Sequence, residues 1–94
     1  MLKNKEELIK QNVQEVINSW DPIGLMNICP EDEYEPEINK IVEFIICNKN
    51  INKISLSEEI RKIFNFYFTS VYNSINEVEE DVASKILEKC KNIL

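Results

Sequence analysis

The sequence predicts an all-α protein, a compact bundle of four main helices plus a short helical turn after Trp20, in a single domain spanning residues 1–94. Apolar residues recur at steps of three and four along four stretches, which is the spacing of one helix face. The period-two alternation of strands never extends over more than a few residues. The only glycine and all three prolines lie within residues 22–36, so helix-breaking residues are confined to one stretch.

The first helix is expected from Asn4 to Trp20 and the second from Pro36 to about Asn48. Their core-facing positions are Ile9, Val13, Val16, Ile17 and Trp20 in the first, and Ile38, Ile41, Val42 and Ile45 in the second. Ile46 broadens the apolar surface of the second helix, as does Phe44 beside it. We therefore expect the second helix to have neighbours on more than one side.

The third helix is expected to open at Ser55, because Glu58 three residues later completes a capping box. Its inward positions are Leu56, Ile60, Ile63, Phe64, Tyr67, Phe68 and Val71. Phe66 lies off that face and is expected to need cover, either from the rest of the fold or from a partner.

The last helix is expected from about Glu77 to Asn92, because Asn76 and Glu79 form a second cap-like pair. Its inward positions are Val78, Val82, Ile86, Leu87, Cys90 and Ile93. Lysines gather toward its C-terminus, where cations complement the helix dipole.

A structural motif is expected at Trp20, Asp21, Pro22 and Gly24. Asp21 followed by Pro22 is typical of a helix start, with the acid as N-cap and the proline at the first helical position. Gly24 indicates either a positive φ or close packing that excludes a Cβ, and the sequence leaves both open. We expect Trp20 to pack against the ring of Tyr34, with Asp21 capping the turn between them.

The densest acidic run supplies the candidate partner-binding residues, which are Glu31, Asp32, Glu33, Tyr34 and Glu35. Such runs are also typical of helix caps and solvated loops, and a tyrosine in a loop is commonly buried with its hydroxyl bonded. The run lacks the regular ligand spacing and the turn glycine of a calcium loop. We therefore assign no metal site, no cofactor and no catalytic residue.

Composition narrows the class of partner. The chain has 17 acidic and 11 basic residues and no histidine, for a net charge of −6, whereas binding to a phosphate backbone needs a basic patch. No apolar run approaches the ~20 residues of a membrane span, and the N-terminus lacks a signal-peptide core. The expected partner is a protein with a basic surface, not nucleic acid or a membrane, in the cytoplasm.

Three cysteines, Cys29, Cys47 and Cys90, are widely spaced and include no C-x-x-C pair. That pattern favours reduced thiols in a cytosol over a disulfide framework. Without histidine, a structural zinc site would need an unusual ligand set. All three are expected to act as small core hydrophobes.

The strings Trp20-Asp21-Pro22-Ile23-Gly24-Leu25 and Pro30-Glu31-Asp32-Glu33-Tyr34, followed by Glu35-Pro36-Glu37-Ile38, resemble the signature of the YugE-like family. That family comprises small acidic bacterial proteins of unknown function, and the resemblance implies a compact helical fold. Similar strings among small bacterial toxin-immunity factors imply a related role. Cys29 stands where the pattern has alanine, and Glu35 where it has aspartate.

Two functions follow as hypotheses. The first is a non-enzymatic protein-binding module, in the immunity- or antitoxin-like class, whose acids steer a basic partner. The alternative is a carboxylate-based or metal-dependent enzyme, or a small-ligand-binding protein, that uses the region of Asp21, Asp32 or Glu35. The sequence leaves the oligomeric state open.

Overall fold

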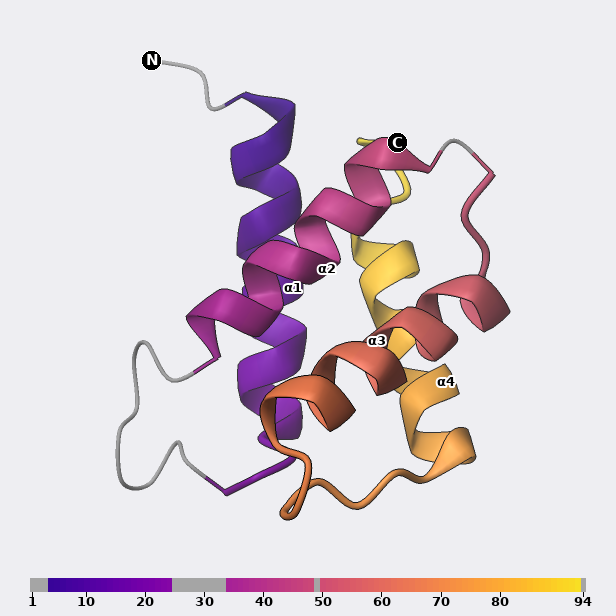
Figure 1. Cartoon of the computed structure of the whole chain (residues 1–94). Helices are drawn as coiled ribbons and strands as arrows, with labels where there is room; N and C mark the ends of the chain where they lie inside the picture. Colours follow the sequence, from indigo (N-terminus) through magenta and orange to yellow (C-terminus); the bar gives the residue numbers. More distant parts are fainter. Residues whose placement is uncertain (1–3, 25–33, 49, 94) are drawn as a thin grey trace.

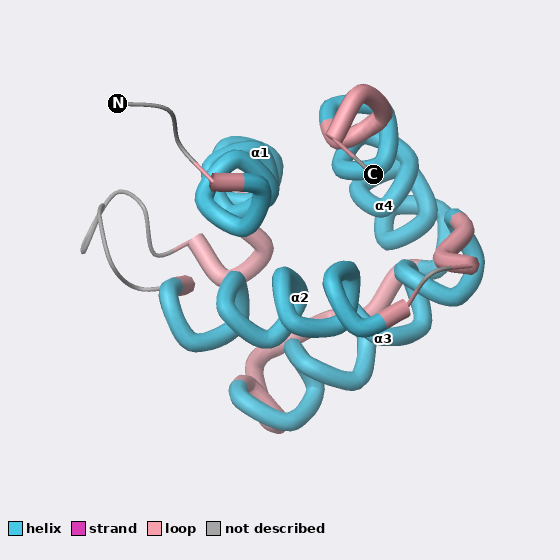
Figure 2. Tube along the Cα trace, turned by 90° about the horizontal axis from the view of Figure 1, so that it is seen from above, coloured by secondary structure: helices cyan, strands magenta, loops and turns pink. Residues whose placement is uncertain are grey.

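A computed structural model describes residues 4–24, 34–48 and 50–93. These residues form four helices and no strand, which confirms the predicted fold class: α1 (Lys5–Trp20), α2 (Glu35–Cys47), α3 (Lys53–Tyr67) and α4 (Asn76–Lys89). Helix α1 packs on α2, α2 on α3, α3 on α4, and α4 returns to α1. Figure 2 shows α1 and α4 on the same side of α2 and α3, which lie across them.

Two helices begin close to where the sequence predicts. Asn4 is the N-cap of α1, and its side chain accepts the Glu7 backbone N–H at 2.8 Å. Helix α2 starts with Pro36 in its first turn and ends at Cys47. Its neighbours α1 and α3 confirm the expectation of contacts on more than one side, although Ile46 stays 47% exposed.

Helix α3 begins two residues before the predicted start, because a different residue caps it. The Asn52 side chain accepts the Ser55 N–H at 2.9 Å, and the Ser55 hydroxyl accepts the Asn52 N–H at 3.0 Å. A capping box is therefore present, but Ser55 is its third helical residue and not the cap. The short hydroxyl serves in either role, so the pattern alone did not fix the register.

Helix α4 likewise starts one residue early, with Ile75 at the N-cap position and Asn76 inside the helix. Asn76 accepts a hydrogen bond from Arg61 of α3, and Glu79 faces the interior. The predicted Asn76–Glu79 cap pair is therefore wrong, since both side chains bind α3 instead.

The core holds the four apolar stripes and is centred on aromatic rings. Phe64 is fully buried and contacts the rings of Trp20, Tyr34, Phe68 and Tyr72. Most predicted inward positions are buried or half-buried. Three are not: Tyr67, Val71 and Val78 are 39%, 63% and 37% exposed.

The end of α3 explains why Tyr67 and Val71 are exposed, contrary to their predicted inward positions. Helix α3 stops at Tyr67, so its apolar spacing does not continue to Val71. Phe66 is 77% exposed and contacts the neighbouring ring of Tyr67 at a centroid distance of 5.1 Å. The described part of the chain does not supply the cover that Phe66 was expected to need.

After α1 the chain leaves the helix (Figure 1). It makes one turn there, in which the Gly24 N–H donates to the Asp21 carbonyl at 3.2 Å. Asp21 has φ 48 and its N–H donates to the Ile17 carbonyl, so it ends α1 and does not begin a new helix as its N-cap. Gly24 has φ +77 with open space where a Cβ would stand. Of the two explanations for this glycine, positive φ holds and close packing does not.

None of the described helices is both long and apolar enough to cross a membrane.

Candidate partner-binding groove

Helices α1 and α4 enclose a groove of about 550 Å³. Its apolar lining comes from Val16 and Trp20 of α1 and from Val78 and Val82 of α4. The two residues of each helix lie one helical turn apart on the same face, so two apolar side chains of α1 face two apolar side chains of α4. The remaining lining is polar: Glu15, Ser19, Asp81, Lys85, Glu88 and Lys89.

At one end the groove joins a second hollow of about 260 Å³ that shares Trp20 and Val78 with it. The loop before α4 forms the other wall of this hollow, through Tyr72, Asn73 and Ile75, and Pro22 lines it as well. Ile75 is 50% exposed and Val78 is 37% exposed. The apolar surface therefore continues from the groove onto the start of α4.

Trp20 is held in place from behind by two aromatic rings. Its ring meets Phe64 edge-on at 5.2 Å and Tyr72 edge-on at 6.0 Å. Phe64 also contacts the ring of Tyr34 at 6.0 Å, so the predicted unit of Trp20 and Tyr34 is built around a third ring. The half-buried indole thus presents its remaining surface to the groove from a rigid support.

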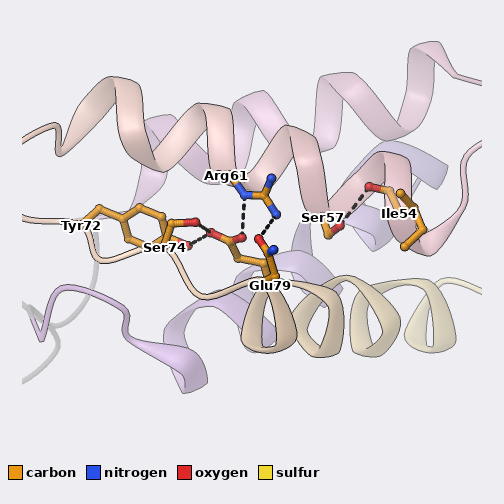
Figure 3. Close-up of polar contacts among 7 residues, drawn as sticks. Ile54, Ser57, Arg61, Tyr72, Ser74 and Glu79 are labelled. Atoms are coloured by element: carbon orange, nitrogen blue, oxygen red, sulfur yellow. Dashed lines mark hydrogen bonds and ion pairs between the residues drawn. The ribbon is translucent and has the colours of Figure 1, made fainter.

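A buried polar cluster fixes the loop at the end of the groove (Figure 3). The Glu79 carboxylate is fully buried. It accepts Arg61 Nε at 2.8 Å, the Ser74 hydroxyl at 2.8 Å and the Tyr72 hydroxyl. Burial, the hydrogen bond to Glu79 and the negative charge of Glu79 together raise the pKa of Tyr72. Glu79 thereby ties α3 and the loop to α4, and it keeps Tyr72 behind Trp20.

Acidic side chains follow one edge of the groove along α4. Glu77, Asp81 and Glu88 are spaced by four and seven residues, which places them on one face of the helix, and we call them the acid stripe. Asp81 lines both the groove and a neighbouring hollow formed with Lys53, Glu77, Glu80 and Ser84. Asp81 pairs with Lys85 at 3.0 Å, whereas no ion pair among the described residues involves Glu77 or Glu88.

Two of the residues predicted to bind a partner, Tyr34 and Glu35, are described, and neither lines the groove. Tyr34 is 1% exposed and its hydroxyl donates to Asp21 at 2.7 Å, so it is a core residue and not a surface anchor. Glu35 pairs with Lys10 at 2.7 Å on the surface between α1 and α2. Glu31, Asp32 and Glu33 lie outside the described residues.

The structural motif divides between two roles. Asp21 and Gly24 shape the turn, whereas Trp20 and Pro22 line the groove and its adjoining hollow. Among the carboxylates of the enzyme alternative, Asp21 binds Tyr34, Glu35 binds Lys10, and Asp32 is not described. Within residues 4–24, 34–48 and 50–93, no group of three histidine, cysteine, aspartate or glutamate side chains is placed to hold a metal ion.

The cysteines differ from one another. Cys90 is buried as predicted, and its burial raises the pKa of its thiol. Cys47 is exposed at the end of α2, so its prediction as a core residue is wrong. It occupies the last position of the helix, next to the exposed Ile46, where the apolar spacing no longer faces a neighbour. Cys29 lies outside the described residues.

Sequence reasoning missed the groove because Val78 has the spacing of a core residue. The only arginine of the chain was the available signal for the polar cluster, since a lone Arg61 among acids is a natural partner for a buried carboxylate.

Comparison of the chain with protein-family models, curated proteins and solved structures gave no match. The resemblance to the YugE-like family therefore stays a prediction.

Proposed function

We propose that the protein is a non-enzymatic binding module for a partner protein with a basic surface. The observation that carries this proposal is the groove, because it combines an apolar lining with the acid stripe along one edge. Apolar surface supplies affinity, and charge supplies orientation and a fast encounter. Glu77 and Glu88 are the acids of the stripe with no ion pair among the described residues, so they are available to a partner's lysines and arginines.

Within this class, an immunity- or antitoxin-like role in the bacterial cytoplasm fits a small acidic chain that covers a basic surface. A toxin that acts on nucleic acid needs such a surface, and covering it would block activity. A toxin gene beside the gene for this chain would support the role. A metabolic operon at that place would favour the enzyme alternative instead.

The direct test is capture of partners from the native cell by three forms of the full chain. The first is wild type and the second is the Glu77→Gln, Glu88→Gln double variant. The third, Glu43→Gln with Glu58→Gln, is the matched control, because it removes two exposed acids of α2 and α3 that do not line the groove. We expect a basic protein to bind wild type and the control, and to bind the stripe variant roughly five- to tenfold more weakly.

Salt dependence provides a second readout. Raising the ionic strength shortens the Debye length, so a partner steered by exposed acids should associate more slowly. Equal capture by all three forms, or captured proteins without an excess of basic residues, would contradict the proposed function.

A further inference from the structure

The geometry points to one kind of occupant for the groove, an amphipathic helix of the partner with an apolar ridge and a basic flank. This inference rests on the proposed function and names the part of the partner that binds. It follows from the shape of the groove, from the charges along its edge and from the occupants that those charges disfavour.

The shape of the groove suits a helix. Val16 and Trp20 lie one helical turn apart on α1, which forms one wall of the groove. Val78 and Val82 lie one turn apart on α4, which forms the other wall. A partner helix presents side chains with the same repeat at positions i, i+3, i+4 and i+7, so its ridge enters between the two walls. Helices α1 and α4 both line the groove, so a partner helix seated in it would pack against both of them.

The exposed fractions identify the anchor point. Val16 and Val82 are 6% and 3% exposed and form the floor of the groove. Val78 is 37% exposed and Ile75 50% exposed, and both lie beside the half-buried Trp20. An apolar side chain of the partner that packs here would bury the exposed surface of Trp20, Ile75 and Val78 together. Aromatic residues in well-packed pockets are common anchors of protein interfaces.

The charges select a basic flank. Glu77 and Glu88 lie eleven positions apart on one face of α4, which corresponds to roughly 16 Å along its axis. Lysines or arginines eleven positions apart on a partner helix running alongside α4 would match that spacing. The Lys89–Glu15 bridge at 3.0 Å joins the two walls at the far end of the groove and sets the limit of the apolar ridge.

The same charges disfavour other occupants. A second copy of this chain carries a net charge of −6, and symmetric pairing through the groove would bring two acid stripes together. An anionic membrane surface or a nucleic acid would meet the same repulsion. Lys85 and Lys89 also line the groove, but each is paired with an acid of the lining, Asp81 and Glu15 respectively. The stripe acids without an ion pair among the described residues, Glu77 and Glu88, therefore favour a basic helix.

The test uses the full chain and a synthetic probe, a tryptophan-free peptide of about 18 residues with leucines on one helical face and lysines on the other. Trp20 is the only tryptophan of the chain, so its emission reports on the groove alone. We expect a saturable blue shift on titration. A peptide of the same composition in shuffled order, and one with glutamate in place of lysine, should each bind at least about tenfold more weakly.

Two substitutions to lysine test whether the peptide binds in the groove. Val78→Lys puts a like charge at the anchor point and should weaken binding by about tenfold or more. Val71→Lys is the matched control, because Val71 is 63% exposed and lies outside the groove. It should change affinity less than about twofold. Circular dichroism melting of both variants checks that each remains folded, and amide shift mapping provides a second measurement on wild type, with changes expected along α1 and α4.

Three outcomes would overturn the inference. The first is equal binding of the probe to the Val78→Lys and wild-type chains. The second is a set of amide chemical-shift changes confined to the surface around Phe66. The third is a wild-type dimer that Val78→Lys dissociates, which would make a second copy of the chain the occupant of the groove. Captured partners separate the two proposals. If Glu77→Gln with Glu88→Gln reduces capture of a basic protein and Val78→Lys does not, the proposed function stands and the helical occupant is wrong. If the charge variant has no effect, the proposed function itself fails.

Discussion

Arg61 Nε donates to Glu79 Oε1 at 2.8 Å, and this ion pair links α3 to α4 with a carboxylate that is fully buried. Tyr72 and Ser74 donate to the other carboxylate oxygen. The pair therefore belongs to a cluster that also positions the loop behind Trp20.

We expect Arg61→Met to lower the free energy of unfolding clearly more than Lys85→Met does, because the fully buried carboxylate of Glu79 would lose its compensating cation. Adding Glu79→Gln to that variant should recover part of the loss, since a neutral amide oxygen can still accept from Tyr72 and Ser74. Urea denaturation measures both. The exposed pair of Lys85 with Asp81 is the control, and Lys85→Met should change stability by no more than about 0.5 kcal/mol. Equal losses at the two sites would contradict the structural importance of the cluster.

Tyr72 makes stability depend on alkaline pH. Its pKa is raised in the folded state, mainly by burial and then by Glu79, so the folded chain keeps the proton after the unfolded chain releases it. This stabilising contribution is fully present below the unfolded pKa of about 10 and falls by about 1.4 kcal/mol per pH unit above it. We expect Tyr72→Phe to be less stable than wild type at pH 7, and this deficit to shrink as pH rises from 10 to 11. A constant difference between the two forms over that range would refute the prediction.

The four helices were predictable because apolar spacing is a local property, and Ile9, Val13, Ile17 and the matching positions of the other helices follow it into the core. The caps were less predictable. Asn52 and Ser55 can each serve as the N-cap or as the third helical residue of a capping box. The residue at which α3 starts therefore depends on how the helix packs in the fold. Helix ends explain why Tyr67 and Val71 are exposed.

The candidate site was not predictable from spacing. Val78 has the position of a core residue, but it lines the groove beside Trp20 and stays 37% exposed, which is a tertiary property. Glu79 reads as a first-turn acid, and only the approach of Arg61, Tyr72 and Ser74 makes its burial favourable. Tyr34 was unpredictable for the opposite reason, because a tyrosine among acids looks like a binding anchor until its burial is known. The prediction for Glu31, Asp32 and Glu33 stays a prediction.

The turn after α1 is joined to the start of α2 through Asp21 and Tyr34. The Tyr34 hydroxyl donates to Asp21 at 2.7 Å and accepts the Ile23 N–H at 3.1 Å. We expect Tyr34→Phe and Asp21→Ala each to lower the free energy of unfolding by about 1 to 2 kcal/mol, with a coupling of about 1 kcal/mol in the double variant. Additive losses in a denaturation cycle would show that the two residues act independently.

Gly24 offers a test of backbone strain without side-chain collision. Its φ is +77, and a Cβ there would meet nothing within 4 Å. We expect Gly24→Ala to cost about 1 kcal/mol of stability from the positive φ alone, and Gly24→Asn to cost less, because asparagine tolerates the left-handed region. Thermal melting of the two variants gives the comparison. A larger loss for asparagine than for alanine would indicate a steric constraint instead.

The two described cysteines should differ sharply in reactivity. Cys47 is exposed, whereas Cys90 is buried with its pKa raised by burial. Alkylation requires the thiolate and access to it, and Cys90 lacks both in the folded state. We expect brief treatment of native protein with a maleimide to modify Cys47 and leave Cys90 protected, with the sites assigned by peptide mass spectrometry. Denatured protein is the control, in which Cys90 should react as well. Native labelling of Cys90 at the rate of Cys47 would mean that the contact between α1 and α4 opens readily, which would remove the rigid walls that the proposed groove requires.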